Sequence, residues 1–118
     1  MKPNYSIKNN FFYAIDGFKE LITEKAFIIE GIFFVLLNIL LLFLSYPLWA
    51  KMFMFASLFI PLIAEAFNTA IEKTVDLVKQ EYNKLAKDAK DIAAFGVLLS
   101  IVFTVLIWIG FIIYFYTN

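Results

Sequence analysis

Residues Gly31 to Ala50 read GIFFVLLNILLLFLSYPLWA, a stretch of twenty residues without a charge. Twenty helical residues rise about 30 Å, which is the thickness of the hydrocarbon core of a bilayer. This stretch therefore indicates a transmembrane helix. The whole chain agrees with it, since 63% of the 118 residues are hydrophobic and the mean hydropathy is +0.82. We expect residues 1–118 to form one small integral membrane domain.

Two further stretches predict membrane spans. Met52 to Ile71 has spanning length and only one charge, Glu65, and Pro61 in its middle predicts a kink because proline lacks a backbone N–H. A charged segment, 73–91, follows, and no charge occurs after it. The expected fold class is an all-α membrane protein with three transmembrane helices at about 31–50, 52–71 and 92–116.

The N-terminal region predicts a different kind of helix. Between about residues 8 and 28 the apolar side chains recur at spacings of three and four, which is typical of an amphipathic helix lying on the membrane surface. Gly17 marks a point where this helix could break. The alternative is a helix that packs on the other helices. A signal peptide is not expected, because about thirty mostly polar or amphipathic residues precede the first span.

The lysines predict the orientation of the chain. They precede the first span and fill the segment between the second and third, whereas the turn between the first two spans holds only Lys51. The positive-inside rule then places the N-terminus and segment 73–91 in the cytoplasm and the C-terminus outside. The cytoplasmic set comprises Lys2, Lys8, Lys19, Lys25, Lys73, Lys79, Lys84, Lys87 and Lys90. The acidic residues lie on the same side, where ATP is found.

The composition excludes several kinds of chemistry. There is no Cys, His or Arg, so a thiolate nucleophile, a histidine base and a thiolate metal site are excluded. No Gly-rich GxxxxGK[ST] loop and no His-Arg-Asp kinase signature occurs. Any reaction must use carboxylates, lysines, amides or hydroxyl groups.

One face of the second span carries such groups. Glu65, Asn68, Glu72 and Asp76 fall within an arc of roughly 80° on a helix. A charge inside a bilayer costs about 3 kcal/mol on insertion scales, so these residues are expected to face protein or water. They could form a hydrogen-bonded seam between helices. Alternatively, they could bind a hard cation such as Mg²⁺, which prefers oxygen ligands.

Two neighbouring groups of charged residues could complete a metal and phosphate site. Glu24 and Glu30 precede the first span at the same expected level, although Glu24 could instead be a solvated charge. Glu65, roughly 9 Å deeper than Ile71, suits a general base for a substrate just below the lipid headgroups. Lys87 and Lys90 could neutralise phosphate, or they could only set the topology. The residues alone name no reaction.

Three stretches resemble the prokaryotic diacylglycerol kinase family. AEAFNTAIEKTVDLV, residues 64–78, is similar to the family signature Glu-x-x-Asn-[Ser/Thr]-Ala-[Ile/Leu]-Glu-x-x-[Val/Ile]-Asp. EKAFIIEG, residues 24–31, and EYNKLAKDAKDIAA, residues 81–94, resemble two further elements of the family. The resemblance implies a homotrimer in the bacterial cytoplasmic (inner) membrane, with active sites shared between subunits. Its expected partners are ATP, a lipid and the membrane, and no nucleic acid.

The resemblance also implies a reaction and a set of roles. The reaction is ATP-dependent phosphorylation of diacylglycerol to phosphatidic acid at the inner leaflet, with Glu65 as the catalytic base. Glu24 and Glu72 would hold the Mg²⁺ that bridges the ATP phosphates. The other implied roles are Asn68 beside the metal, Lys90 on the phosphates, Asp76 and Asp91 in support, and Glu81 and Asn83 near the nucleotide base. The sequence departs from the family pattern at Asn83 and at Ala93–Ala94. These departures affect the implied nucleotide contacts and leave the implied base and metal ligands unchanged.

Two alternatives stay open at this point. A related branch of the family phosphorylates undecaprenol, a polyisoprenoid alcohol whose hydroxyl group also lies near the membrane interface. A non-enzymatic small helical membrane protein is the second alternative. A trimer is also expected on physical grounds, because three thin spans would hardly bury Glu65 and Asn68 from lipid.

Overall fold

The computed structural model describes residues 6–78 and 81–118, and all of its regular structure in these ranges is helical. The order is α1 (Ile7–Leu21), α2 (Lys25–Phe43), α3 (Leu48–Ser57), α4 (Phe59–Val78) and α5 (Lys84–Thr117). The expected all-α class is confirmed over the described residues. Lys2 and Lys79, which the orientation argument used, lie outside them.

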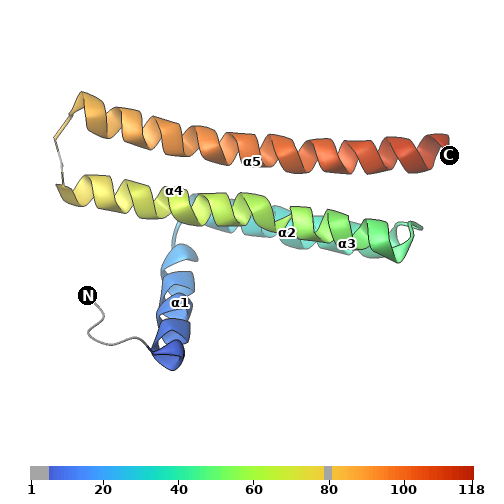
Figure 1. The fold of residues 1–118 in the computed structure, drawn as a ribbon, viewed down its shortest axis with the longest axis horizontal. Helices are drawn as coiled ribbons and strands as arrows, with labels where there is room; N and C mark the ends of the chain where they lie inside the picture. Colours follow the sequence, from blue (N-terminus) through green and yellow to red (C-terminus); the bar gives the residue numbers. More distant parts are fainter. Residues whose placement is uncertain (1–5, 79–80) are drawn as a thin grey trace.

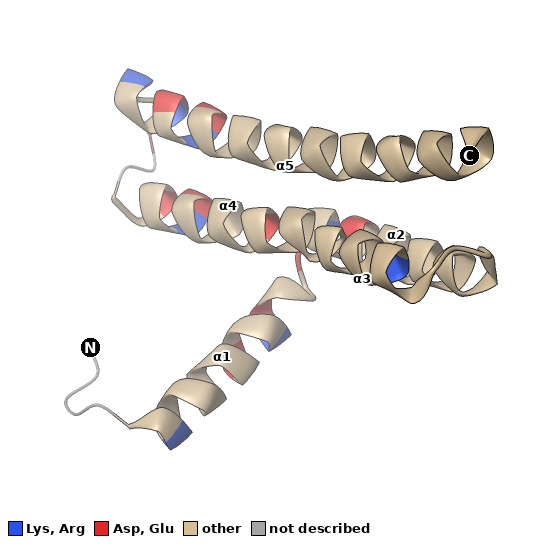
Figure 2. Cartoon of the chain, turned by 45° about the vertical axis from the view of Figure 1, so that its right-hand side comes forward, with Lys and Arg blue, Asp and Glu red and all other residues tan. Residues whose placement is uncertain are grey.

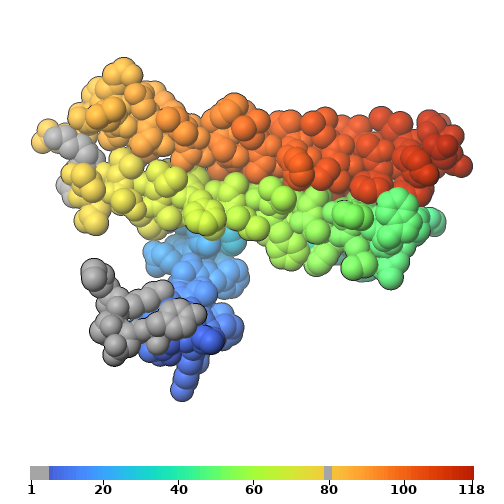
Figure 3. All heavy atoms as spheres, viewed as in Figure 1, coloured from blue at the N-terminus to red at the C-terminus, as the bar shows by residue number. Residues whose placement is uncertain are grey.

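The long helices run side by side, and α1 lies to one side of them and points away from the bundle (Figure 1). Helices α3 and α4 follow one another almost in line, α2 lies beside them, and α5 packs along α4. The C-terminus lies at the end of this bundle opposite the connection between α4 and α5. In the space-filling view α1 projects from the bundle as a separate arm (Figure 3).

Three helical stretches are long and apolar enough to cross a membrane: 25–43, 48–78 and 84–117. The last two have 31 and 34 residues. At 1.5 Å per residue both exceed a hydrocarbon core of about 30 Å, so part of each must project from it. Figure 2 shows charged residues gathered where α4 and α5 approach their connection, whereas the C-terminal part of α5 carries none. The structure thus has three candidate spans, as the sequence predicted, with different bounds.

The first helix is shorter than the predicted 8–28 and does not break at Gly17. It ends at Leu21, and α2 begins at Lys25. In the turn between them, the Thr23 hydroxyl donates to the Glu20 carbonyl at 2.6 Å, and the Thr23 N–H donates to the same oxygen at 3.2 Å. A threonine that bonds its local backbone in this way competes with the helical hydrogen bonds.

The first span ends at Phe43 and not at Ala50. Pro47 has no N–H to donate to the Phe43 carbonyl, and a proline also disfavours helical geometry at the residue before it, Tyr46. Residues 44–47 are therefore non-helical, and Pro47 becomes the N-cap of α3. Leu48 to Ala50 thus belong to the second span.

The second span is interrupted at Leu58, one turn before Pro61. Because Pro61 has no N–H, the Ser57 carbonyl lacks its intrahelical donor. The Thr104 hydroxyl of α5 donates to that carbonyl at 2.9 Å and also lies 3.1 Å from the Ser100 carbonyl of its own helix. The indole N–H of Trp108 lies 3.2 Å from the Met54 carbonyl and 3.1 Å from the Ser57 hydroxyl. Side chains of α5 therefore satisfy the backbone that the proline frees.

The apolar core surrounds this interruption. Its buried members, one or more from each span, are Leu41, Met54, Leu58 and Trp108. Outside it, most large apolar side chains of α2–α5 are exposed. A soluble protein rarely exposes so much apolar surface, whereas a membrane protein presents it to lipid or to other subunits.

Replacing Thr104 with valine tests the role of its hydroxyl group. We expect Thr104→Val to lower the unfolding free energy by about 0.5–2 kcal/mol, because the Ser57 carbonyl loses its donor inside the membrane. The measurement is reversible unfolding in mixed micelles. Thr117→Val, whose hydroxyl bonds only within its own helix, is the matched control.

The proline makes this prediction specific. In a Pro61→Ala background the N–H of residue 61 can serve the Ser57 carbonyl, so Thr104→Val should cost clearly less there. An equal cost in both backgrounds would show that Thr104 stabilises the bundle by packing alone.

Candidate active site

The predicted polar face of α4 runs from the interior to the surface. Glu65 is only 5% exposed and Thr69 is also buried, Asn68 is half-buried, and Glu72 and Asp76 are exposed. One chain therefore buries Glu65 by itself. Contrary to expectation, Glu65 does not need a trimer to leave the lipid, because the helices of one chain already bury it.

Glu30 of α2 lies near Glu65. The Glu30 and Glu65 carboxyl groups are close enough to influence each other, and the Glu30 Oε1 atom is buried without a hydrogen-bond partner among the described residues. Two neighbouring carboxyl groups that are partly withdrawn from water repel each other when both are charged, and a proton or a cation between them relieves this repulsion. This arrangement identifies a pair of acids where the sequence indicated one.

Glu30 was predicted only as an acid that could complete the site, although the sequence held a clearer signal. It shares a helix face with Phe34, Leu37 and Leu41, at the spacing i, i+4, i+7 and i+11. These three residues belong to the packed side of α2. A carboxylate on the packed side of a membrane helix points to a use inside the bundle.

Asn68 links Glu65 to Glu72. Its amide Nδ2 donates to Glu72 Oε1 at 3.1 Å, and its side chain also reaches Glu65. Its Oδ1 atom is buried without a partner in the part of the chain that the structure describes. This arrangement leaves a free amide oxygen next to two carboxylates.

These carboxylate and amide oxygens are of the type that a magnesium ion prefers. Mg²⁺ usually takes one or two carboxylates and completes its shell with water and phosphate oxygens. Within the described ranges no three acidic side chains converge on a metal position. Glu24 and Glu72, the predicted ligands, both lie within electrostatic range of Glu65. With the free Asn68 oxygen, these two residues stay the predicted metal ligands, and phosphates would have to supply the remaining oxygens.

Glu24 stands at the N-terminus of α2 and is held by a residue that the sequence did not suggest. The Lys73 Nζ atom lies 3.1 Å from Glu24 Oε1 and 3.7 Å from Glu20 Oε1. The structure thus brings Glu24 to α4, as expected, but through an ion pair. The sequence did not predict this ion pair, because the positive-inside rule already explains a lysine in a cytoplasmic segment.

The predicted phosphate-binding lysine joins α5 to α4. The Lys90 Nζ atom lies 2.5 Å from Asp76 Oδ1, so the structure brings these two predicted residues together. Asp91 instead pairs with Lys87 of its own helix, at 2.6 Å. All four side chains are partly or largely exposed, and exposed ion pairs contribute about 0–1 kcal/mol. A multiply charged phosphate could therefore replace these partners at little cost.

The residues predicted near the nucleotide base lie at the start of α5. The Asn83 side chain accepts a hydrogen bond from the Ala86 N–H at 3.2 Å and caps the helix. Glu81 is exposed just before it. Asn83 therefore has a structural role, and the nucleotide contact of both residues stays a prediction.

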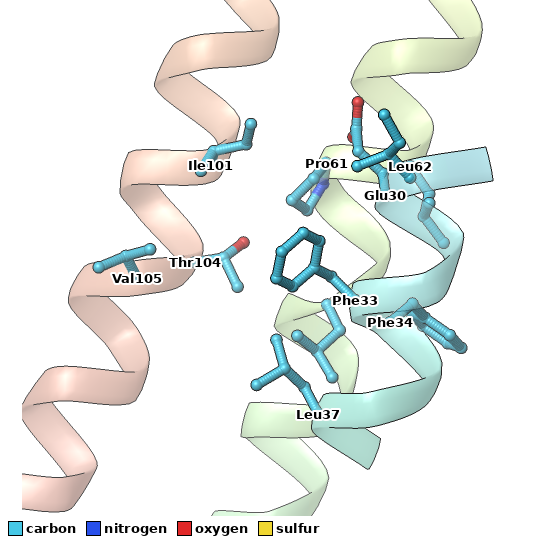
Figure 4. A pocket seen from close by; sticks show the side chains of 11 residues that line it. Glu30, Phe33, Phe34, Leu37, Pro61, Leu62, Ile101, Thr104 and Val105 are labelled. Atoms are coloured by element: carbon cyan, nitrogen blue, oxygen red, sulfur yellow. The ribbon is translucent and has the colours of Figure 1, made fainter. Parts of the chain in front are cut away.

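An apolar groove of about 400 Å³ lies between α2, α4 and α5. Figure 4 shows Glu30 at one end, near Pro61 and Leu62, and Leu37 at the other. Apart from Glu30, Thr104 is the one polar side chain among its described lining residues. The groove thus connects the carboxyl pair with the interior of the bundle by a path that suits a hydrocarbon chain.

Comparisons with known proteins bear on this site. The family model described as prokaryotic diacylglycerol kinase matches residues 12–112. A diacylglycerol kinase of Escherichia coli K12 is 32% identical over 87 residues, which cover 74% of this chain and 71% of the relative. One from Helicobacter pylori 26695 is 36% identical over 103 residues, covering 82% and 77%, and one from Sinorhizobium is 40% identical over 91 residues, covering 76% and 66%.

Proposed function

The chain belongs to the prokaryotic diacylglycerol kinase family, and we propose that it is a membrane lipid kinase that transfers the γ-phosphoryl group of ATP to diacylglycerol. The observation that carries the proposal is the buried Glu65 carboxyl group next to the half-buried Glu30, which stands at the end of an apolar groove between membrane-spanning helices. Such a site accepts a hydroxyl group attached to a hydrocarbon chain. The product is phosphatidic acid.

The chemical step needs one proton acceptor. As the lipid hydroxyl oxygen attacks the γ-phosphorus, its proton passes to the Glu65 carboxylate, and the bond from the γ-phosphorus to the leaving oxygen of ADP breaks. Glu30 holds Glu65 from the α2 side, and burial keeps water from competing with the lipid hydroxyl. Glu65 is thus positioned to accept a proton from the lipid hydroxyl and not from bulk water.

The remaining charges bind the phosphates. Glu24, Glu72 and the free Asn68 oxygen would hold a divalent cation, Mg²⁺, which would neutralise negative charge on the ATP phosphates. Lys90 adds a positive charge from α5, and Asp76 and Asp91 orient the lysines of this end of the bundle. Glu81 and Asn83 face the nucleotide base from the α4–α5 connection.

We further propose the orientation and assembly of the chain. The lysine-rich end of the bundle faces the cytoplasm of a bacterial inner membrane, the C-terminus lies outside, and α1 lies along the inner surface. Support comes from the charge distribution (Figure 2) and from the direction of α1, which points away from the bundle (Figure 1). The chain assembles as a homotrimer with shared active sites, which would cover part of the exposed apolar faces of α2–α5.

Removal of the proposed base tests the reaction. We expect Glu65→Gln to lower the turnover of diacylglycerol by about 10²–10⁴-fold, because an amide cannot accept the hydroxyl proton. The measurement is metal-dependent transfer of labelled phosphate from ATP in mixed micelles, with the oligomeric state checked in parallel. Asp16→Asn, an exposed carboxyl group on α1, is the control and should keep its turnover. Full turnover in Glu65→Gln would remove Glu65 from the mechanism, and no metal-dependent transfer by the unaltered protein would favour a non-enzymatic role.

A competition between two lipids tests the substrate. With equal amounts of diacylglycerol and undecaprenol in one micelle, we expect most of the labelled phosphate in phosphatidic acid. The groove offers about 400 Å³ beside the carboxyl pair, which suits an acyl chain better than a long branched polyprenol. Preferential labelling of undecaprenol would identify the chain as a polyisoprenoid alcohol kinase.

A further inference from the structure

One lysine connects three helices at the proposed metal site. The Lys73 ammonium of α4 lies 3.1 Å from Glu24 at the start of α2 and 3.7 Å from Glu20 in the last turn of α1. It therefore stands between two carboxylates and has three N–H donors to share between them. Neither Lys73 nor Glu20 has a part in the proposed function.

This contact matters because Glu24 is also a proposed metal ligand. A divalent cation on Glu24 would stand within a few ångströms of the ammonium, and two cations so close repel each other. The Lys73 side chain is 51% exposed and that of Glu24 is 38% exposed, so their ion pair is weak enough to exchange. The doubly charged ion has the stronger attraction for the carboxylate, and it displaces the lysine.

The displaced ammonium has a partner within reach. Glu20 is already 3.7 Å away, and the long, flexible lysine side chain can move onto it by small rotations. Helix α1 leaves room for this change, since a cavity of about 380 Å³ separates it from α4 and is lined by Gly17, Ala70 and Lys73 itself.

We propose that Lys73 is a positioning residue that holds Glu24 near α4 in the metal-free protein and passes to Glu20 when a divalent cation binds. Two consequences follow. The lysine competes with the metal, so it weakens metal binding, and the metal in turn strengthens the ion pair between α1 and α4. The inference rests on the proposed function, because it requires Glu24 as a metal ligand.

Metal binding alone tests the first consequence. Free Mn²⁺ is followed by electron paramagnetic resonance in the full-length protein without nucleotide. We expect Lys73→Gln to tighten Mn²⁺ binding roughly two- to fivefold, which corresponds to the loss of one exposed ion pair. Lys25→Gln is the matched control, because Lys25 follows Glu24 directly and makes no ion pair with a described residue. Equal tightening in both variants, or none in Lys73→Gln, would overturn the competition.

Hydrogen exchange tests the second consequence. We expect Mn²⁺ to slow amide exchange in residues 7–21 of the unaltered protein, because the Lys73–Glu20 pair then holds α1 more firmly. Lys73→Gln and Glu20→Gln should both abolish this effect. Slowing that persists in either variant would overturn the transfer of Lys73 to Glu20.

A third variant separates the failure of this inference from that of the proposed function. Glu24→Gln should weaken Mn²⁺ binding strongly if Glu24 is a ligand. Unchanged binding in Glu24→Gln would remove the metal site itself. Weakened binding in Glu24→Gln, together with no effect of Lys73→Gln, would refute only the role of Lys73.

Discussion

The structure depends on how a backbone carbonyl that an interrupted helix leaves unpaired finds a hydrogen-bond donor inside a membrane. Pro61 deprives the Ser57 carbonyl of its donor, and no water is available in the hydrocarbon core to replace it. Thr104 and Trp108 of α5 reach the Ser57 and Met54 carbonyls and the Ser57 hydroxyl. Because these contacts are directional, they fix how α5 lies against α3 and α4. The apolar packing around them has no such directionality, so it could not set this alignment alone.

The same alignment places the charged ends of the helices. With α5 fixed along α4, Lys90 meets Asp76 beyond the membrane interior. One face of α4 then leads from the buried Glu65, through Asn68, to the exposed Glu72. The cost of removing Glu65 from water is only reasonable if the site gains something from it. The proposed reaction, which takes a proton from a lipid hydroxyl and a phosphoryl group from a nucleotide, would use this change from a buried to an exposed environment along α4.

Much of the fold follows from hydropathy, and its details do not. The uncharged runs predicted three spans, and helical spacing predicted the polar face of α4. The helix ends were harder to predict from the sequence, because they depend on single residues such as Pro47 and Thr23. The effects of these residues depend on the turns in which they lie. Glu65 was predicted as a polar-face residue, whereas its burial next to Glu30 depends on packing between helices far apart in the sequence. Nothing in the sequence pointed to Lys73, because its ion pairs with Glu24 and Glu20 depend on how α1 and the start of α2 lie against α4.

The central claim is that Glu24 and Glu72 meet at one cation beside Glu65. Crystals grown with Mn²⁺ and a non-hydrolysable ATP analogue would test it most directly through the anomalous scattering of manganese. The account predicts a peak roughly 2.0–2.5 Å from carboxylate oxygens of both residues, next to the phosphates, with Lys73 no longer on Glu24. An ordered nucleotide whose metal lies away from both carboxylates would contradict it.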